Sequence, residues 1–303
     1  MTPADRSWSL AVVGPYRLDL TVAILRRFST NLVDVVAPDG TYLRAHRDER
    51  GDAFVIAVRQ STPETLAVRT FGTPVVTRDA ALALARRTLG TGRATPHFAR
   101  AAASLPWLAA IADRMIGGRP PRYATLWEAC VNAIVFQQVS LHAAGAILGR
   151  VVRALGTPVV HDGTTVYAFF TPRALVDAGD ELLRAAGLSV AKIATLRRVA
   201  GALADGTLDE STLAALDSVE ASRRLCAIKG IGPWTAAVVL LRGLGRLDVF
   251  PQNDSGVARS LRALTDEPVD VASALDALAP EQGMLYYHLL LARLEARGDL
   301  PAS

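Results

Sequence analysis

The pattern of hydrophobic and polar positions changes near residue 92 of the chain. Before it, residues 33–60 contain apolar runs separated by a Pro-Asp-Gly turn and a charged loop, which predict strands. Residues 77–90 have helical spacing and end at Gly90, a residue suited to the position after a helix. Beyond residue 92 helical spacing dominates. The pattern predicts an α+β protein with a small N-terminal α/β domain over residues 1–92 and an all-helical core after it.

One helix of this core has a well-marked start. It follows the turn GGRPPR, and Thr125 and Glu128 have the spacing of a capping box. Gln138 falls on the apolar face of this helix and Gln137 lies beside it, where an amide costs free energy unless it finds a partner. Two interpretations stay open: both glutamines cap the end of a neighbouring helix, or both face solvent where the helix ends before Ser140.

Two later helices are joined by a very short loop. Residues 220–228 and 233–245 have helical spacing, and Pro233 suits the first turn of the second helix. Gly230 and Gly232 in the loop permit left-handed torsions and leave its tip without side chains. Backbone N–H groups there, at the positive end of the second helix, can face an anion such as a DNA phosphate. A plain helix–helix turn is the alternative.

Composition limits the classes of protein and cofactor to be considered. The chain has 303 residues, of which 50% are hydrophobic and 20% charged, and it contains two cysteines. Two cysteines exclude a four-cysteine zinc site or iron–sulfur cluster from this chain. The apolar runs are shorter than a membrane span and the first residues lack a signal-peptide pattern, so we expect a cytoplasmic protein without a membrane partner. The net charge of +4 permits a polyanionic partner.

A resemblance to a known family rests on residues 227–259, AIKGIGPWTAAVVLLRGLGRLDVFPQNDSGVAR. This segment resembles the helix-hairpin-helix signature of the DNA glycosylase superfamily, and in particular that of the AlkA-type 3-methyladenine DNA glycosylases, known as type II. Residues 117–140 and 169–200 resemble further segments of this family, and residues 7–29 do so more weakly.

The resemblance implies a domain organisation and a partner. One helical lobe would consist of residues 93–125 and 247–303 and carry the catalytic aspartate. The other would consist of residues 126–246 and end in the helix-hairpin-helix. The implied partner is double-stranded DNA that contains a damaged base, and we expect a monomer, associated with the nucleoid if the protein is bacterial.

The chemistry of such an enzyme needs a carboxylate. Cleavage of an N-glycosidic bond builds positive charge on the sugar, and a carboxylate beside that carbon stabilises the charge and orients or deprotonates a water molecule. By resemblance Asp254 is this catalytic residue, whereas we expect Asp248 to be structural. Asp254 is also an ordinary N-cap candidate. Both roles are compatible, because the start of a helix favours the ionised carboxylate.

The resemblance also assigns contacts to DNA. The hairpin backbone would grip the DNA backbone, and a monovalent cation can assist it there; no other cofactor and no catalytic metal is expected. A wedge residue would fill the gap left by the flipped nucleotide, because the sugar carbon is unreachable inside the base stack. The residues assigned to DNA binding are Lys229, Gly230, Ile231, Gly232, Thr235 and, as the wedge, Gln138.

A pocket for the flipped base is implied by the same resemblance. Its residues are Trp234, Gln137, Val238 and Leu290. The face of Trp234 suits a cationic alkylated purine through stacking and cation–π attraction. The family has a tyrosine at Val238 and a Trp-Tyr pair at Leu290 and its neighbour, so this pocket is less aromatic. Tyr286 or the adjacent Tyr287 can compensate for the loss.

The sequence therefore predicts a monofunctional DNA glycosylase that removes alkylated bases in base excision repair. Relatives that also cut the strand carry a lysine nucleophile where this chain has Trp234, and a Schiff base needs an amine. Lyase activity is therefore not expected. Two alternatives remain: a glycosylase for neutral deaminated or etheno lesions, and a non-catalytic protein that binds damaged DNA.

Overall fold

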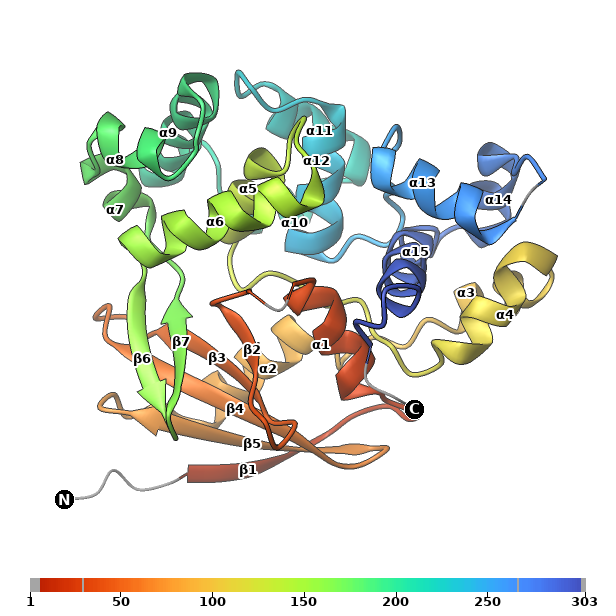
Figure 1. Ribbon diagram of the computed structural model, residues 1–303, viewed down its shortest axis with the longest axis horizontal. Coiled ribbons are helices and arrows are strands. Elements are labelled where there is room, and N and C mark those ends of the chain that lie inside the picture. The colour runs from red at the N-terminus through yellow and green to blue at the C-terminus, as the bar shows by residue number, and fades with distance from the viewer. Residues whose placement is uncertain (1–5, 29, 266, 301–303) are drawn as a thin grey trace.

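The computed structural model describes residues 6–28, 30–265 and 267–300, and it shows an antiparallel sheet below two groups of helices (Figure 1). The first five residues of the predicted N-terminal domain and the last three of the chain lie outside this description. The strands lie in the order β1-β5-β4-β3-β2, and every neighbouring pair is antiparallel. Their bounds are β1 Arg6–Ala11, β2 Asp34–Val36, β3 Tyr42–Arg47, β4 Ala53–Thr62 and β5 Thr65–Gly72.

Two helices pack on one face of this sheet, α1 (Leu18–Arg26) and α2 (Arg78–Leu89), and both contribute to a single buried apolar cluster with the strands. The prediction of a helix over residues 77–90 is confirmed. The Thr77 hydroxyl accepts a hydrogen bond from the backbone N–H of Ala80, and Gly90 ends the helix with a φ of 61°.

The remaining helices form two groups, each around its own buried apolar cluster. One cluster centres on α5, α9 and α12, and the other on α15 with α3, α4, α13 and α14. Among the described residues, no helix is long and apolar enough to cross a bilayer. Bounds are α3 Pro96–Ala103, α4 Pro106–Arg114, α5 Leu126–Val135, α6 Leu141–Leu155, α7 Pro172–Asp177, α8 Asp180–Ala185, α9 Val190–Ala204, α10 Glu210–Ala215, α11 Ser218–Cys226, α12 Pro233–Val239, the π-helical turn η1 Leu240–Leu244, α13 Ser255–Leu264, α14 Val271–Leu278 and α15 Gly283–Glu295.

The helical part is not entirely helical, and here the prediction is wrong. Strands β6 (Thr157–His161) and β7 (Thr164–Ala168) form a hairpin between α6 and α7. Asp162 and Gly163 occupy its two-residue turn with φ of 45° and 74°, as a type I′ turn requires. Val159, Val166 and Ala168 of this hairpin pack on the face of the sheet opposite α1 and α2. The Asp-Gly pair is a local turn signal, so the sequence itself indicated this hairpin.

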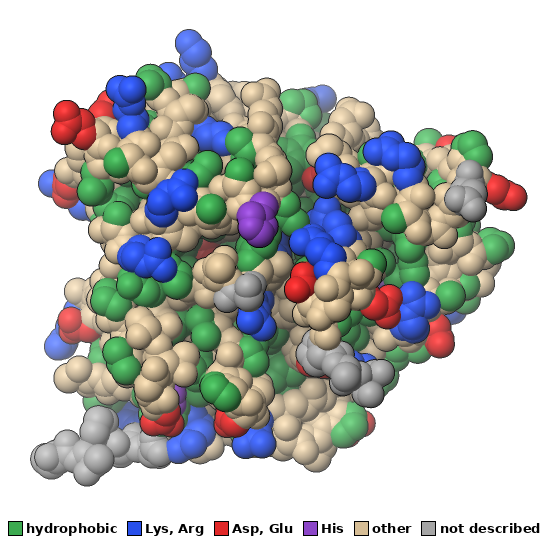
Figure 2. All heavy atoms as spheres, viewed as in Figure 1, with side chains coloured by type: hydrophobic (Ala, Val, Ile, Leu, Met, Phe, Trp, Pro, Cys, Tyr) green, Lys and Arg blue, Asp and Glu red, His purple; other side chains and the backbone are tan. Residues whose placement is uncertain are grey.

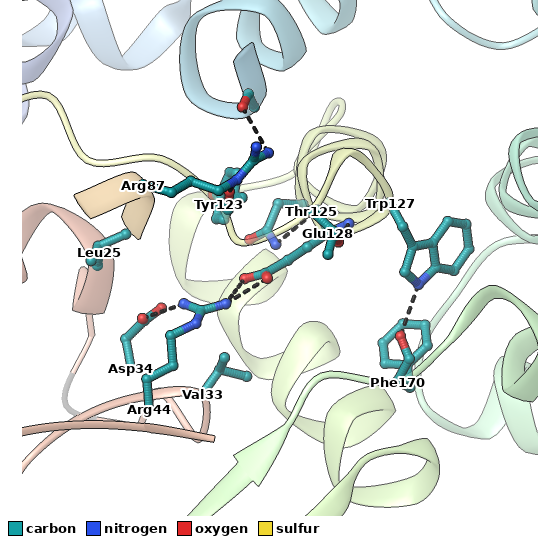
Figure 3. Close-up of polar contacts among 12 residues, drawn as sticks. Leu25, Val33, Asp34, Arg44, Arg87, Tyr123, Thr125, Trp127, Glu128 and Phe170 are labelled. Atoms are coloured by element: carbon teal, nitrogen blue, oxygen red, sulfur yellow. Dashed lines mark hydrogen bonds and ion pairs between the residues drawn. The ribbon is translucent and has the colours of Figure 1, made fainter. Parts of the chain in front are cut away.

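A buried ion-pair network joins the sheet to helix α5. Arg44 on β3 contacts Asp34 on β2 and Glu128 on α5, each at 2.5 Å, and all three side chains are at most 3% exposed (Figure 3). Thr125 caps α5 as predicted, whereas the Glu128 carboxylate pairs with Arg44. Removing one member would leave a buried charge without its partner, which is strongly destabilising. The network fixes the position of the helix that leads to the glutamine pair.

Candidate active site

The carboxylate of Asp254 is held at both oxygens. Asp254 is the N-cap of α13, and its Oδ1 accepts hydrogen bonds from the backbone N–H groups of Gly256 at 2.7 Å and Val257 at 3.0 Å. Its Oδ2 accepts a hydrogen bond from the indole N–H of Trp234 at 2.9 Å. The predicted N-cap role is confirmed. These donors fix the direction in which the carboxylate faces.

A cavity of about 110 Å³ lies beside this carboxylate. Trp234 and Val238 from α12, Phe136 from the end of α5, Tyr286 from α15 and Arg27 from the end of α1 contribute to its wall. Four aromatic side chains, with Tyr123 as the fourth, and a carboxylate from segments far apart in the sequence thus surround one small space. Such a combination of apolar walls and a few convergent polar groups is typical of a ligand site.

Two residues predicted for the base pocket lie elsewhere. Leu290 is 5% exposed and packs inside the apolar cluster around α15. The residues of α15 that line the cavity are Tyr286 and Arg293, which lie two turns apart. Gln137 turns toward the hairpin instead. Of the two tyrosines considered as aromatic replacements, Tyr286 faces the cavity, and Tyr287 is completely buried in the core.

The helix-hairpin-helix forms as predicted and packs closely on α9. Gly230 has a φ of 102°, and a Cβ at this position would lie 2.0 Å from the Thr195 hydroxyl, so the turn requires glycine. The Gln137 amide donates to the Gly230 carbonyl at 3.0 Å and to the Thr235 hydroxyl at 2.8 Å. Gln137 therefore satisfies polar groups of a neighbouring helix end, whereas Gln138 is exposed, so each of the two interpretations holds for one glutamine and not for both.

The other predicted hairpin contacts differ in what they present to solvent. Gly232 is the N-cap of α12 with an ordinary φ of −101° and open space beside its Cα, so the left-handed torsion expected there is absent. Lys229 is exposed. Ile231 and Thr235 are buried, and the N–H of Ile231 donates to the Ile228 carbonyl. Among these residues, Gly232 and Lys229 are the ones whose surroundings leave room for an approaching anion.

Gln138, the predicted wedge, is exposed and has a φ of 53°. A non-glycine residue in this left-handed region is uncommon and costs free energy, and such residues concentrate at functional sites. In the sequence, Gln138 follows directly on Phe136, which lines the cavity, and Gln137, which contacts the hairpin. Figure 2 shows Lys and Arg side chains gathered over α13, next to the hollow between the two groups of helices.

Cationic side chains also surround the cavity. Burial disfavours the charge of Arg27, but the nearby Tyr123, Tyr286 and Asp254 help to raise the pKa of its guanidinium. Burial lowers the pKa of Arg293. Burial raises the pKa of the Tyr286 phenol. No group of three potential metal-ligating His, Cys, Asp or Glu side chains occurs in the described part of the chain.

Three arginines contribute to this wall, Arg27, Arg259 and Arg293, and sequence reasoning assigned none of them to the site. Arg293 had a visible signal, because it interrupts the apolar run LLLARL of α15. Arg27 had none: it lies more than 200 residues before Asp254, and only the packing of α1 against α15 brings it to the cavity.

Several known DNA repair proteins are similar to this chain. Residues 131–268 match the family described as HhH-GPD superfamily base excision DNA repair protein. A Mycobacterium tuberculosis protein described as a probable bifunctional transcriptional activator/DNA repair enzyme AlkA is 33% identical over 230 residues, which cover 75% of this chain and 44% of that protein. The chain spans about half the length of the curated relatives that it matches.

Two solved structures are also similar. The 3-methyladenine DNA glycosylase of Archaeoglobus fulgidus has a TM-score of 0.79 and 26% identity, and the match covers 95% of this chain and 99% of that one. The DNA-3-methyladenine glycosidase of Bacillus halodurans has a TM-score of 0.51 and 31% identity, and the match covers 67% of this chain and 91% of that one. The hairpin, the capped aspartate and these matches together show that the chain belongs to the HhH-GPD superfamily of base excision DNA repair proteins.

Proposed function

We propose that the chain is a monofunctional DNA glycosylase, which hydrolyses the N-glycosidic bond of alkylated bases in double-stranded DNA. The observation that carries this proposal is the Asp254 carboxylate, held by α13 and Trp234 at the edge of a cavity with aromatic walls. The relatives named for 3-methyladenine support the class of substrate.

Asp254 acts on the sugar in this proposal. As the C1′–N bond breaks, its electron pair leaves with the base and the sugar carbon becomes cationic, so that a fixed carboxylate beside it lowers the barrier. Oδ1 is occupied by two backbone donors, whereas Oδ2 accepts one hydrogen bond from Trp234 and retains capacity for a further partner. Oδ2 then faces the sugar and orients the water that adds to C1′.

The placement of the two lysines supports hydrolysis without strand cleavage. The Lys192 ammonium donates to the Val135 carbonyl at 2.8 Å, and burial lowers its pKa. Lys229 is exposed at the base of the hairpin. Neither lysine contributes to the wall of the cavity beside Asp254. Water is therefore the nucleophile of the proposed reaction.

The hairpin holds the DNA backbone and Gln138 fills the gap left by the flipped nucleotide. The N-terminal N–H groups of α12 lack acceptors within their own helix and can bind a phosphate at the open Gly232 side. The carbonyls of Lys229 and Gly230 accept hydrogen bonds from Arg198 and Gln137, and each keeps a second lone pair. Such oxygen donors fit a monovalent cation, which would strengthen the attraction for phosphate.

One assay tests the proposal. Duplexes carrying 7-methylguanine or 3-methyladenine are incubated with the protein, and the abasic sites produced are converted to strand breaks by alkali and counted. We expect release of both bases. Binding to an abasic duplex without release of any base would instead identify a non-catalytic protein that recognises DNA damage.

A further inference from the structure

A buried cation reaches the base cavity from a helix of the N-terminal part. Arg27 directly follows α1, is 9% exposed, and lines the cavity that also contains Asp254. Its guanidinium carbon lies 5.3 Å from the centre of the Phe136 ring. The backbone of Arg27 has a φ of 52°, a conformation that costs free energy in any residue other than glycine. The fold therefore holds Arg27 in a backbone conformation that costs free energy.

The guanidinium of Arg27 has unused hydrogen-bonding capacity. It carries five N–H donors and stays protonated in proteins. Its buried Nε has no hydrogen-bond partner in the described part of the chain. Buried polar groups are nearly always paired, and the guanidinium of Arg27 lines the cavity, so its donors are available to a ligand that enters there. Here the cavity is the space that would receive a base.

A fixed cation in this position distinguishes bases by their charge. An uncharged base takes the electron pair of the glycosidic bond and leaves as an anion, so a guanidinium beside it becomes more stabilising as the bond breaks. A base alkylated at a ring nitrogen is already cationic and leaves uncharged. For that base the guanidinium is repulsive in the bound state and offers little as the bond breaks.

We propose that Arg27 determines specificity in this pocket, by donating a hydrogen bond to the acceptor edge of the flipped base and stabilising the charge that an uncharged base gains on leaving. This inference rests on the proposed glycosylase function and concerns the same cavity. Arg27 keeps its proton throughout. Water supplies hydroxide to C1′, and the proton it loses neutralises the released base after departure from the pocket, so the hydrolysis balances.

The test compares two substrates and two neighbouring arginines. Single-turnover rates are measured on duplexes containing 1,N6-ethenoadenine, which is uncharged, and 7-methylguanine, which is cationic. Arg27→Gln removes the guanidinium from the pocket. Arg26→Gln is the matched control, because Arg26 lines the wide groove next to α1 but not the cavity beside Asp254. Arg27→Lys keeps the charge with different donor geometry.

We expect Arg27→Gln to slow release of ethenoadenine by about 10²-fold, the usual cost of one well-placed donor. Release of 7-methylguanine should change by no more than roughly threefold or become faster, because its departure needs no anion stabilisation. Arg27→Lys should give an intermediate rate on ethenoadenine, and Arg26→Gln should match the unsubstituted protein on both duplexes.

Several results would overturn the inference. Equal losses on both duplexes would reduce Arg27 to a structural role, and an unchanged ethenoadenine rate would remove it from the reaction. Release of 7-methylguanine but of no uncharged base by the unsubstituted protein would contradict it as well. Release of neither base would instead defeat the proposed glycosylase function, which keeps the two failures distinguishable.

Discussion

The indole N–H of Trp234 donates a 2.9 Å hydrogen bond to Oδ2 of Asp254. Trp234 belongs to the hairpin and Asp254 to the start of α13, so this bond connects the element proposed to hold DNA with the carboxylate proposed to act on the sugar. The sequence predicted a stacking face for Trp234. The structure adds a donor that fixes the carboxylate from the side opposite its helix cap.

Replacing this donor should slow the reaction while leaving the pocket apolar. Trp234→Phe keeps an aromatic ring but removes a hydrogen bond to a charged group, worth about 1.5–3 kcal/mol. We expect single-turnover excision to fall by roughly 10- to 100-fold at that energy. Trp127→Phe is the matched control, because its indole N–H bonds the Phe170 carbonyl within the core (Figure 3). The control should lose stability but not rate; equal rates for both variants would refute the role of the Trp234 donor.

The hairpin can be tested by adding charge where the fold has space. Gly232→Asp places a carboxylate at an open position with ordinary torsions, so folding should be retained. Repulsion from phosphate should weaken binding to damaged and undamaged duplexes alike by about 10-fold, in titrations at fixed salt. Gly201→Asp adds the same charge on α9, again without nearby atoms. If both variants bind DNA like the unsubstituted protein, the hairpin does not face DNA.

Lyase activity offers a third test. Borohydride added during turnover reduces a Schiff base to a stable covalent adduct, and we expect little or none, because Trp234 provides no amine beside Asp254. Adduct yield is read from a denaturing gel, with a known bifunctional glycosylase as the positive control. Efficient trapping that disappears in Lys229→Ala would show that the exposed hairpin lysine reaches the sugar.

Two buried histidines predict how stability depends on pH. Burial lowers the pKa of His46 to about 3 and that of His288 to about 4, from an ordinary value of 6.5. Below pH 6.5 the unfolded chain binds protons that the folded chain does not, so the free energy of unfolding falls as pH decreases, by up to about 1.4 kcal/mol per pH unit for each histidine. His46→Phe, beside the ring of Phe54, should make this fall shallower in denaturant titrations between pH 7 and 5. An unchanged slope would show that His46 becomes protonated in the folded state.

Local signals explain how much of this molecule could be predicted. The cap at Thr125, the end at Gly90 and the hairpin at Gly230 depend on neighbouring residues, so the sequence indicated them directly. The Asp162-Gly163 turn carried an equally local signal, and the β6–β7 hairpin was predictable from it.

The missed features depend on distant packing. Arg27 becomes a pocket residue only because α1 packs against α15. Leu290 does not line the pocket, because the face of α15 that reaches the pocket carries Tyr286 and Arg293. Helical spacing indicates that a residue is on an apolar face, but it does not tell which neighbour that face will meet.

The most direct test of the account replaces Asp254. Asp254→Asn retains an oxygen for the backbone N–H groups of α13, so it should fold, but it removes the negative charge and presents an amide to Trp234. Asp270→Asn is the matched control, since Asp270 caps α14 through the same two positions of the following turn and is exposed.

The deciding measurement is the single-turnover excision rate of Asp254→Asn on an alkylated duplex, with binding to an abasic duplex measured in parallel. We predict a rate lower by about 10²–10³-fold or more, with abasic binding retained; a 7-methylguanine substrate, which leaves uncharged, should be affected less than an uncharged base. A rate close to that of Asp270→Asn and the unsubstituted protein would show that Asp254 is a helix cap alone, and would contradict its catalytic role.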